Sequence, residues 1–477
     1  METDPFFKRI PAREMRAVMR VMMMATGLQL AYGPNSLAQQ SLNDPSFQPG
    51  IGADKPVNGI IKVPDGRILV GGEFTSFNNT SNAYLVRLYP DGSIDPGFSA
   101  QGLTDGPVTR MQTQSDGTVL VAGTFNNLSG VPRRGLGRLA ADGTVDLTFD
   151  PLDLIATNEA IYAIAEQADG QILIAATASV FADTTSRILR LQTNGLLDNG
   201  FNCTISIEGF VHALLPQPNG AILFGGGIYV NGDTTRWGLF ELKSTGELDL
   251  GFDAGLSQYS TVFSLARKPD GRILVGGVML LPGSHVGLPL AQLDGKQWDL
   301  TFTSDFDGIA QPNNPGQPYI TTVQLQPDGK LVAGGSFFQV GGYWRRQILR
   351  LDLAGHVDPC FDPGLGLGGN APGAVRTLSL SQNGSLLAGG EFYGCDLAYG
   401  QNHIAKLLPH NDCGAVRVYL SLEGFVAATF PPGITNVLET SYDLRTWEPM
   451  QTTTDPYIFV VQRATEPQQF FRARQIR

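Results

Sequence analysis

Aspartate recurs along this chain three positions before a phenylalanine, and this is the first pattern that could do chemistry. The pairs are Asp44/Phe47, Asp95/Phe98, Asp146/Phe149, Asp198/Phe201, Asp249/Phe252, Asp299/Phe302 and Asp358/Phe361. Carboxylates gathered in one ring would bind cations, because carboxylate oxygens are ligands of hard metal ions. An aspartate in a tight turn, however, accepts backbone N–H bonds. Since an enzyme rarely needs a ring of equal acids, we predict that each aspartate caps a turn and each phenylalanine packs between neighbouring units.

A basic residue recurs at one position shortly before each of these turns. It is Arg87, Arg138, Arg190, Arg350 and Lys406, with Glu241 and Gln292 in its place in two units. Its regularity predicts a structural role, in which the basic side chain pairs with a neighbouring aspartate.

Other signatures of catalysis fail on their context. Residues 364–369 satisfy G-x-G-x-x-G, but Pro363 and Pro372 flank them and no helix follows, which excludes a dinucleotide-binding turn. The histidines show no H-E-x-x-H spacing, and no G-x-S-x-G elbow occurs. We therefore predict no catalytic residue, no metal site and no cofactor.

The elements that position these residues follow from a second repeat. An apolar run, a turn that ends in glycine and a run with small residues recur around Gly66, Gly117, Gly170, Gly220, Gly271, Gly329 and Gly384. Asp-Gly or Asn-Gly between alternating apolar runs is a strong hairpin signal, because these turns need positive φ. Each unit is therefore predicted to be an antiparallel meander of four strands, here called A to D.

Units of roughly 50 residues built of strands and turns are typical of propeller blades. The last unit lacks its own Asp-x-x-Phe segment, whereas residues 44–47 carry an extra copy at the beginning. We predict an all-β fold: a seven-bladed propeller of four-stranded antiparallel blades, closed by an N-terminal strand near residues 42–47. Closure of this kind leaves no free sheet edge in the ring.

The doubled motif resembles the delta-60 repeat family, β-propeller repeats of exported bacterial proteins. The residues that carry the resemblance are Pro64-Asp65-Gly66-Arg67-Ile68-Leu69-Val70-Gly71-Gly72-Glu73-Phe74 and Arg87-Leu88-Tyr89-Pro90-Asp91-Gly92-Ser93-Ile94-Asp95-Pro96-Gly97-Phe98. Two units depart from it, with Ala175-Ala176 in place of Gly-Gly and a turn shifted by one residue at Leu293-Asp294-Gly295-Lys296. The family supplies no established catalytic residues to transfer.

Composition and charge agree with an all-β chain. The 477 residues include 58 Gly and 30 Pro, 42% are hydrophobic and 16% are charged, which disfavours helices and allows a large core. A formal net charge of −11 argues against nucleic acid and anionic membranes as partners. We expect a monomer.

Three segments make up the predicted domain organisation. Residues 1–38 combine basic residues, the apolar run 21–32 and small residues before Gln39, as in an export signal; a basic tail is the alternative. Residues 39–413 form the propeller. Residues 414–477 break the period and look like small β-sandwich modules that end exported proteins. No later stretch reaches the ~18 apolar residues of a membrane span, so the mature chain is expected to be secreted or cell-surface without membrane insertion.

Candidate binding residues lie on the long loops. The A–B and C–D turns leave from one face of the ring, and the longer B–C and D–A loops leave from the other, where variable loops on a rigid scaffold favour binding. The candidates are Arg133, Arg134, Tyr229, Arg236, Trp237, Asp305, Asp307, Tyr343, Trp344, Arg345 and Arg346. Aromatic and arginine side chains suit protein or glycan contacts, but the same side chains can cover blade edges.

The four cysteines, Cys203, Cys360, Cys395 and Cys413, are compatible with an oxidising compartment. Cys395 and Cys413 both belong to the last unit, so we predict that they form a disulfide; four free thiols are the alternative.

Taken together, these patterns predict an exported, non-catalytic binding scaffold for a protein or a glycan. A carbohydrate-active propeller enzyme is the first alternative, and it requires acids or histidines that converge on the centre of the ring. A cell-surface structural protein is the second.

Overall fold

The computed structural model describes most of the chain from Asp44 onward. The described residues are 44, 46–99, 103–151, 154–180, 183–281, 287–306, 318–341, 343–361, 363, 367, 373–381, 383–395 and 398–408, and strands between 417 and 475. The chain divides into two compact units, Ser41–Asp412 and a second that contains Cys413–Arg477. The predicted export signal lies outside the described residues.

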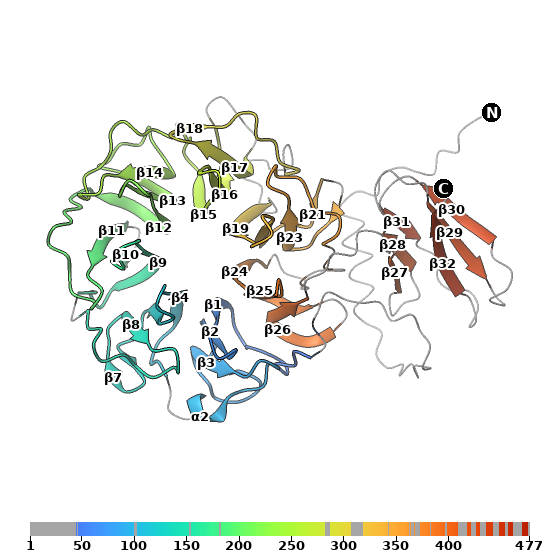
Figure 1. Ribbon diagram of the computed structural model, residues 1–477, viewed down its shortest axis with the longest axis horizontal. Helices are drawn as coiled ribbons and strands as arrows, with labels where there is room; N and C mark the ends of the chain where they lie inside the picture. Colours follow the sequence, from blue (N-terminus) through green and yellow to red (C-terminus); the bar gives the residue numbers. More distant parts are fainter. Residues whose placement is uncertain are drawn as a thin grey trace. The chain divides into compact units, whose positions relative to one another are not determined.

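The larger unit consists of antiparallel sheets arranged radially around an axis (Figure 1). From the inside outward, the first three groups of strands are β1 (Val57–Lys62), β2 (Ile68–Gly72) and β3 (Leu85–Leu88); β4 (Val108–Thr113), β5 (Val119–Gly123) and β8 (Leu136–Leu139); and β9 (Glu159–Glu166), β10 (Ile172–Val180) and β11 (Asp183–Leu191). The next two are β12 (Ile207–Pro216), β13 (Ile222–Val230) and β14 (Leu239–Leu242); and β15 (Thr261–Arg267), β16 (Ile273–Met279), β17 (Leu288–Asp294) and β18 (Gln297–Trp298). The last two are β19 (Tyr319–Leu325), β20 (Leu331–Ser336) and β23 (Ile348–Leu351); and β24 (Val375–Leu380), β25 (Leu386–Cys395) and β26 (Ala398–Leu407). Two of these groups join into one sheet where β11 pairs with β12.

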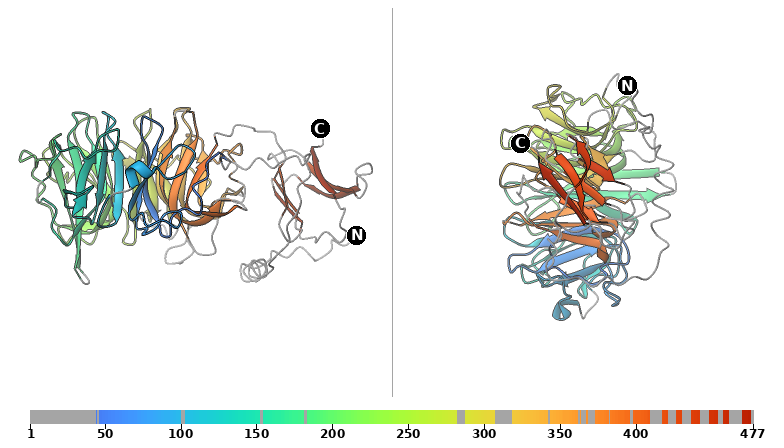
Figure 2. Two further views of the ribbon diagram at one scale, coloured as in Figure 1. Left: turned by 90° about the horizontal axis from the view of Figure 1, so that it is seen from below. Right: turned by 90° about the vertical axis from the view of Figure 1, so that its right-hand side faces the viewer.

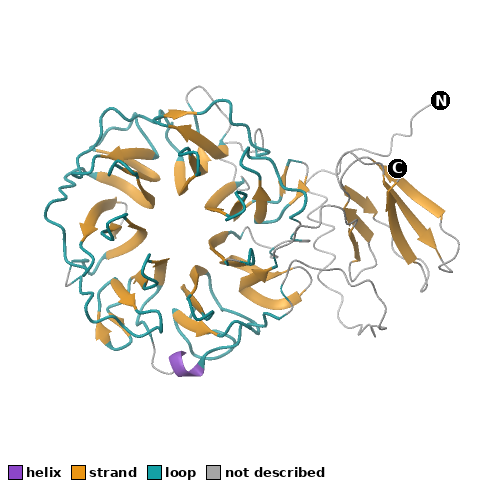
Figure 3. Ribbon diagram, viewed as in Figure 1, coloured by secondary structure: helices purple, strands orange, loops and turns teal. Residues whose placement is uncertain are grey.

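Almost all the regular structure that is described is strand (Figure 3). Short hairpins, β6 (Asn127–Leu128) with β7 (Val131–Pro132) and β21 (Gln339–Val340) with β22 (Tyr343–Trp344), lie within B–C connections, and the helix α2 (Pro96–Ser99) follows β3. Seen from the side, the strands of the propeller run between two faces that carry the loops (Figure 2). The strands and the radial arrangement confirm an all-β propeller.

The A–B turns have the predicted chemistry. At the first of them, Gly66 has a φ of 88°, a conformation that glycine adopts without strain. The Asp65 carboxylate accepts a hydrogen bond from the Arg67 N–H at 2.9 Å, which closes the turn. The strands on either side are buried and apolar, so the turn and the core specify the same hairpin.

The fourth strand of the blades is shorter than predicted. After β3, the chain returns through a single bridge between Leu88 and Ile94, and equivalent single bridges follow β8, β11, β14 and β23. Only β18 extends to two residues among the described D segments. The backbone turns at once to place Asp95, whose N–H donates to the Arg87 carbonyl, so the Asp-x-x-Phe turn replaces a regular strand.

The recurring aspartate holds this turn and the basic residue, as predicted. Asp95 accepts hydrogen bonds from the Gly97 N–H at 3.1 Å and from Arg87 Nε at 2.9 Å, and the Arg87 guanidinium lies 4.2 Å from the centre of the Phe98 ring. Arg87 also donates to the carbonyl of Asp142 in the next blade. The same Arg–Asp pair occurs as Arg138–Asp146, Arg190–Asp198 and Arg350–Asp358. The motif therefore closes these four blades, and at Arg87 it also ties the blade to its neighbour.

The N-terminal segment contacts the last sheet of the ring in the same way. The Asp44 N–H donates to the Lys406 carbonyl at 2.8 Å, Lys406 Nζ lies 2.9 Å from the Asp44 carboxylate, and Phe47 is fully buried. The described residues 44 and 46–47 lie in a turn, and the rest of the predicted N-terminal strand near residues 42–47 lies outside the described residues. Although burial alone would raise the pKa of Asp44, hydrogen bonds from Lys406 and Ser46 hold that pKa below its usual value.

The second unit contains two small antiparallel sheets. One consists of β27 (Arg417–Leu420), β28 (Val426–Thr429) and β31 (Tyr457–Val460), and the other of β30 (Glu448–Thr453), β29 (Asn436–Ser441) and β32 (Phe470–Gln475). These strands lie where the alternating pattern after residue 415 predicts β-structure.

The disulfide prediction is wrong. Cys360 is disulfide-bonded and Cys203 is a free thiol. Since the chain has four cysteines, Cys360 must pair with Cys395 or Cys413, so these two cannot pair with each other. The side chains of both lie outside the described part. The prediction paired two cysteines because both belong to the last repeat unit. It did not consider a pair with Cys360, which belongs to the unit before it.

The closure of the ring can be tested by removing the Asp44 carboxylate. We expect Asp44→Asn to lower the free energy of unfolding by about 1–3 kcal/mol, because it leaves a largely buried Lys406 ammonium without its charged partner. Asp95→Asn, within an interior blade, is the matched control and should cost a similar amount. Urea unfolding at neutral pH measures both; unchanged stability for Asp44→Asn beside a clear loss for Asp95→Asn would contradict the equivalence of the two segments.

Candidate functional site

A β-bulge interrupts the inner strand of each sheet at an equivalent position. In β1, for example, Val57 pairs with Gly72 and Gly59 with Gly71, so Asn58 has no partner in the ladder. The bulge residues are Asn58, Thr109, Tyr162, His212, Phe263, Thr321 and Arg376. Bulges re-aim side chains and are common beside functional sites, so this position is the natural place to look for one.

The Gly-Gly dipeptide of the B strand makes room for the bulge. A Cβ on Gly390 would overlap the carbonyl oxygen of Ala374, and one on Gly72 would overlap that of Pro56. A Cβ on the preceding glycine, Gly389, would lie 2.6 Å from Val57 Cγ1 of the neighbouring inner strand. The small-residue strand that is visible in the sequence therefore makes room for the bulge and for the packing between blades, with Gly-Gly in most blades and Ala175-Ala176 opposite the bulge at Tyr162.

Three bulge residues link neighbouring inner strands. Asn58 Nδ2 donates to the carbonyl of Val108 at 3.1 Å, and the hydroxyls of Thr109 and Thr321 donate to the carbonyls of Ile161 and Val375. These side chains satisfy backbone groups of the next blade, so their role is structural.

Aromatic rings occupy the bulge position of three consecutive blades and form a continuous row. Ring centroids are 5.3 Å apart for Tyr162 and Phe210, 5.9 Å for Phe210 and His212, 5.0 Å for His212 and Phe263, and 5.8 Å for Phe263 and Tyr319. The Phe210 and His212 rings are nearly parallel, with 6° between their planes. We call these five residues the aromatic row; all are partly exposed.

Charged residues lie opposite this row. Arg376 is 2.9 Å from the carboxylate of Glu73 and 2.9 Å from that of Glu391, and it donates to Asn58 Oδ1 at 2.8 Å. The side chains of Arg376, Glu73 and Glu391 are 31%, 47% and 46% exposed, so solvent reaches the cluster. Arg110, which follows the bulge in β4, donates to the Thr109 carbonyl at 3.2 Å.

Two pKa shifts agree with side chains that face the axis of the ring. Burial and then the charge of Arg110 lower the pKa of His212 to about 4, although β9 lies between their strands. Burial and then the charge of Arg376 lower the pKa of Arg110 to about 10, although β1 lies between those two strands. Side chains of non-adjacent blades can interact in this way where they point toward the centre of the ring.

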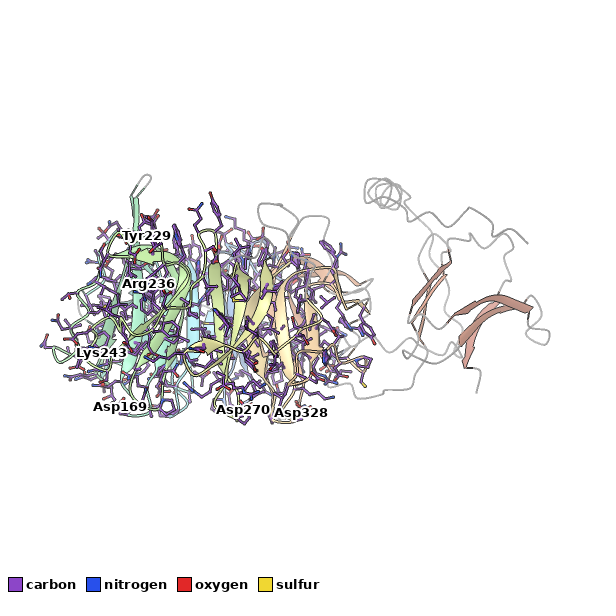
Figure 4. All side chains as sticks on the ribbon, turned by 90° about the horizontal axis from the view of Figure 1, so that it is seen from above. Asp169, Tyr229, Arg236, Lys243, Asp270 and Asp328 are labelled. Atoms are coloured by element: carbon purple, nitrogen blue, oxygen red, sulfur yellow. The ribbon has the colours of Figure 1, made fainter. Side chains whose placement is uncertain are left out.

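We call the aromatic row together with Arg110, Arg376, Glu73 and Glu391 the axial cluster. It lies toward the face with the long loops. The bulge precedes the A–B turn by eight residues in every case, as at Asn58 and Gly66, so it lies toward the opposite end of the inner strand. In Figure 4, Asp169, Asp270 and Asp328 of the A–B turns lie at one face, and Tyr229 and Arg236 lie toward the other.

The structure gives the predicted loop residues mostly contacts with their own blade. Arg133 is buried and lies 3.5 Å from the Asp150 carboxylate, and Arg236 donates to the Phe252 carbonyl and lies 3.7 Å from Asp253. Tyr229 and Trp237 pack on each other with centroids 4.9 Å apart. Arg134, which follows Arg133 in the connection between β5 and β8, is partly buried.

The second group of predicted residues lies around the β21–β22 hairpin. Arg345 is buried over the Tyr343 ring, and Arg346 lies over the Phe338 ring. Asp305 accepts the Val357 N–H at 2.6 Å, which joins its D–A loop to a C–D turn. Asp307 and the Trp344 side chain lie outside the described residues. None of these contacts joins the predicted residues to the axial cluster, which sequence reasoning missed.

Neither a metal centre nor a spanning helix is found in the described part of the chain. No group of three or more His, Cys, Asp or Glu side chains there could hold a metal ion. Among the residues searched there, no helix has the length and apolar character that a membrane span needs.

The fold and its repeats define the chain as a β-propeller repeat protein. Five segments, residues 64–98, 114–149, 167–201, 217–252 and 326–361, match a family described as a domain of unknown function (DUF5122) β-propeller. Each match begins at or near an A–B turn and ends at the phenylalanine of Asp-x-x-Phe. No curated protein matches the chain.

The solved structures that match the chain have little sequence in common with it. Regucalcin from Agrobacterium tumefaciens, described as a calcium-binding protein, is 13% identical, with 62% of this chain and 85% of that chain covered and a TM-score of 0.34. A fungal alcohol oxidase in complex with copper is 11% identical, with 88% and 90% covered and a TM-score of 0.38. An ulvan lyase of a polysaccharide lyase family is 10% identical, with 76% and 96% covered and a TM-score of 0.35. None of their ligands or activities is transferred to this chain.

The electrostatics of the axis can be tested by titrating His212. We expect NMR of the ring protons to give a pKa of about 4, and Arg110→Gln to raise it, because a positive charge nearby disfavours the imidazolium. Since the unfolded histidine takes up its proton near pH ~6.5, the lowered pKa makes stability fall as pH falls from there toward the folded value. His212→Gln assigns the signal and should remove that part of the pH dependence. An ordinary pKa for His212 would contradict the burial of the ring at the axis.

Proposed function

We propose that this chain is an exported, non-catalytic binding scaffold whose ligand binds to the axial cluster, on the face that carries the long loops. The observation that carries the proposal is the aromatic row beside the charged residues. In three consecutive blades, the bulge presents a ring where other blades use a side chain that links neighbouring strands.

We further propose that the propeller has seven blades of the delta-60 type. The sheets begun by β1, β4, β9, β12, β15, β19 and β24 support this count, because their inner strands contact one another in succession and β24 contacts β1. The contact between Val57 and the Gly389 backbone supports closure at the same place. Residues 414–477 are proposed to be a separate small β-module of the sandwich type.

The chemistry of the cluster favours a glycan over a protein. The aromatic row offers flat apolar ring faces, while Arg376, Glu73, Glu391 and Tyr162 offer polar groups nearby. Binding sites for small ligands combine apolar walls with a few oriented polar groups. A pyranose has the matching chemistry, with an apolar face and hydroxyls at its rim, so we take a glycan chain or its end as the ligand.

A carbohydrate-active enzyme is the second candidate, because Glu73, Glu391 and His212 meet its requirement for acids or histidine near the axis. Two features favour binding without turnover. Arg376 forms ion pairs with Glu73 and Glu391, each at 2.9 Å, whereas the acid of a glycosidase must present a free, protonated carboxyl to its substrate. Every carboxyl with a displaced pKa in the described part of the chain is shifted downward, as at Asp95, where hydrogen bonds and Arg87 outweigh burial.

Location and assembly complete the proposal. The leader-like residues 1–38 support export, to the medium or the cell surface, and the net charge of −11 disfavours nucleic acid. A cell-surface structural protein would use the C-terminal module as its anchor; deletion of residues 414–477 with unchanged cell association would count against it. We propose a monomer.

The proposed site is tested by screening the purified protein on a glycan array and measuring the affinity of each hit by calorimetry. We expect Phe263→Ala to weaken binding by about tenfold or more, because the row loses the ring between His212 and Tyr319. Trp237→Ala, which removes an aromatic ring of a long loop away from the axis, is the matched control and should bind normally.

The same samples separate the candidate functions. Reducing-end and unsaturated-product assays on each bound glycan should show no turnover; turnover would replace the scaffold by the enzyme. Loss of binding in Trp237→Ala with normal binding in Phe263→Ala would move the site to the loops. Binding to no glycan at all would overturn the glycan as ligand.

A further inference from the structure

Arg110 differs from the other arginines around it, because no ion pair with a carboxylate accounts for its charge. Its one hydrogen bond is to the Thr109 carbonyl, and the charges that act on it are those of Arg376 and, if ionised, Tyr162. By contrast, Arg376 lies between two glutamates, and Arg87 is paired with Asp95. These comparisons concern the residues that the structure describes.

An unpaired guanidinium in this position is costly. Burial and a second arginine both disfavour the charged form, which is why the pKa of Arg110 falls to about 10, yet the group remains charged at neutral pH. A partly buried charge without a partner is unfavourable, and a ligand that supplies the opposite charge would remove this cost. Uncharged residues occupy the equivalent position in other blades, as Gly59 in β1 and Ala163 in β9.

We propose that Arg110 binds the carboxylate of an acidic sugar whose ring stacks on the aromatic row, so that the ligand is a uronate-containing glycan. This inference rests on the proposed function and specifies its substrate class. The guanidinium fork matches a carboxylate with two parallel hydrogen bonds. The charge of Arg110 interacts electrostatically with both Tyr162 and His212, so one ligand at the axis can contact the cation and the aromatic row together.

The charge balance favours one carboxylate over a densely sulfated chain. Arg110 and Arg376 contribute two positive charges, and Glu73 and Glu391 two negative charges, so the cluster sums to zero before a ligand binds. A single carboxylate near Arg110 uses the unpaired cation, whereas several sulfates would meet the two glutamates and a chain of net charge −11.

The test compares acidic oligosaccharides with their neutral counterparts. Calorimetry is run with tetramers of galacturonate, glucuronate and mannuronate, each beside its carboxyl-reduced form, which keeps the ring and loses the charge. We expect at least one uronate to bind the protein about tenfold more tightly than its reduced form, with affinity that falls as salt rises. Arg110→Gln should abolish that difference, and Arg272→Gln, which removes a partly exposed cation near the A–B turns, should preserve it.

Each outcome bears on one of the two proposals. Equal affinity for acidic and reduced forms, with binding that still depends on Phe263, would overturn the uronate inference and leave the glycan scaffold standing. Normal uronate preference in Arg110→Gln, with an unchanged melting temperature, would also overturn the inference. Binding of an oligoglutamate peptide in place of every oligosaccharide would overturn both.

Discussion

The structure depends on the fit between each inner strand and a pair of small residues, which are both glycine in most blades and are Ala122-Gly123 and Ala175-Ala176 in two. The first glycine, such as Gly389, receives a branched side chain of the neighbouring inner strand, Val57, at a distance that leaves no space for a methyl group. The second, Gly390, lies against the carbonyl of the bulged strand. One dipeptide therefore sets both the spacing between blades and the bulge. Since interiors are packed to crystal-like density, such a contact is restrictive, and the same solution recurs around the ring.

The pair of a basic residue and the aspartate of the Asp-x-x-Phe turn stabilises the outer side of the blades. Two blades replace the basic residue, and their contacts show which interaction the aspartate needs. Where Glu241 replaces the usual arginine, Lys296 Nζ lies 2.9 Å from the Glu241 carboxylate and also pairs with Asp249. Lys296 belongs to the shifted turn that departs from the repeat. Where Gln292 replaces the arginine, it donates to Asp299 at 2.8 Å and accepts from Lys268. The partly buried aspartate thus keeps a donor in both blades, as an uncompensated carboxylate would be destabilising.

Much of this architecture can be predicted from the chain, because local and long-range requirements coincide at the same residues. Gly66 and Asp65 specify a hairpin turn by their own conformational preferences, and the Asp44 segment is recognisable as a displaced copy of Asp95. The disulfide of Cys360 is not predictable in this way, since it depends on which units meet in space. The shortened fourth strand also escapes the pattern, because a bridge between Leu88 and Ile94 suffices once Asp95 is bound to Arg87.

The axial cluster was missed for a related reason, and that reason explains how a repetitive scaffold acquires a specific site. The bulge residue stands eight positions before the turn glycine in every repeat, yet its type varies more than that of any neighbouring position, so it does not register as a motif. The scaffold constrains where the side chain points and leaves its chemistry free. Asn58, Thr109 and Thr321 use that freedom to bind the next blade. Tyr162, His212 and Phe263 are consecutive around the ring, so their rings gather on one side of the axis while the charges of Arg376, Glu73 and Glu391 gather on the other. A nearly symmetric frame thereby presents an asymmetric surface, which is what recognition of a ligand with distinct apolar and polar sides requires.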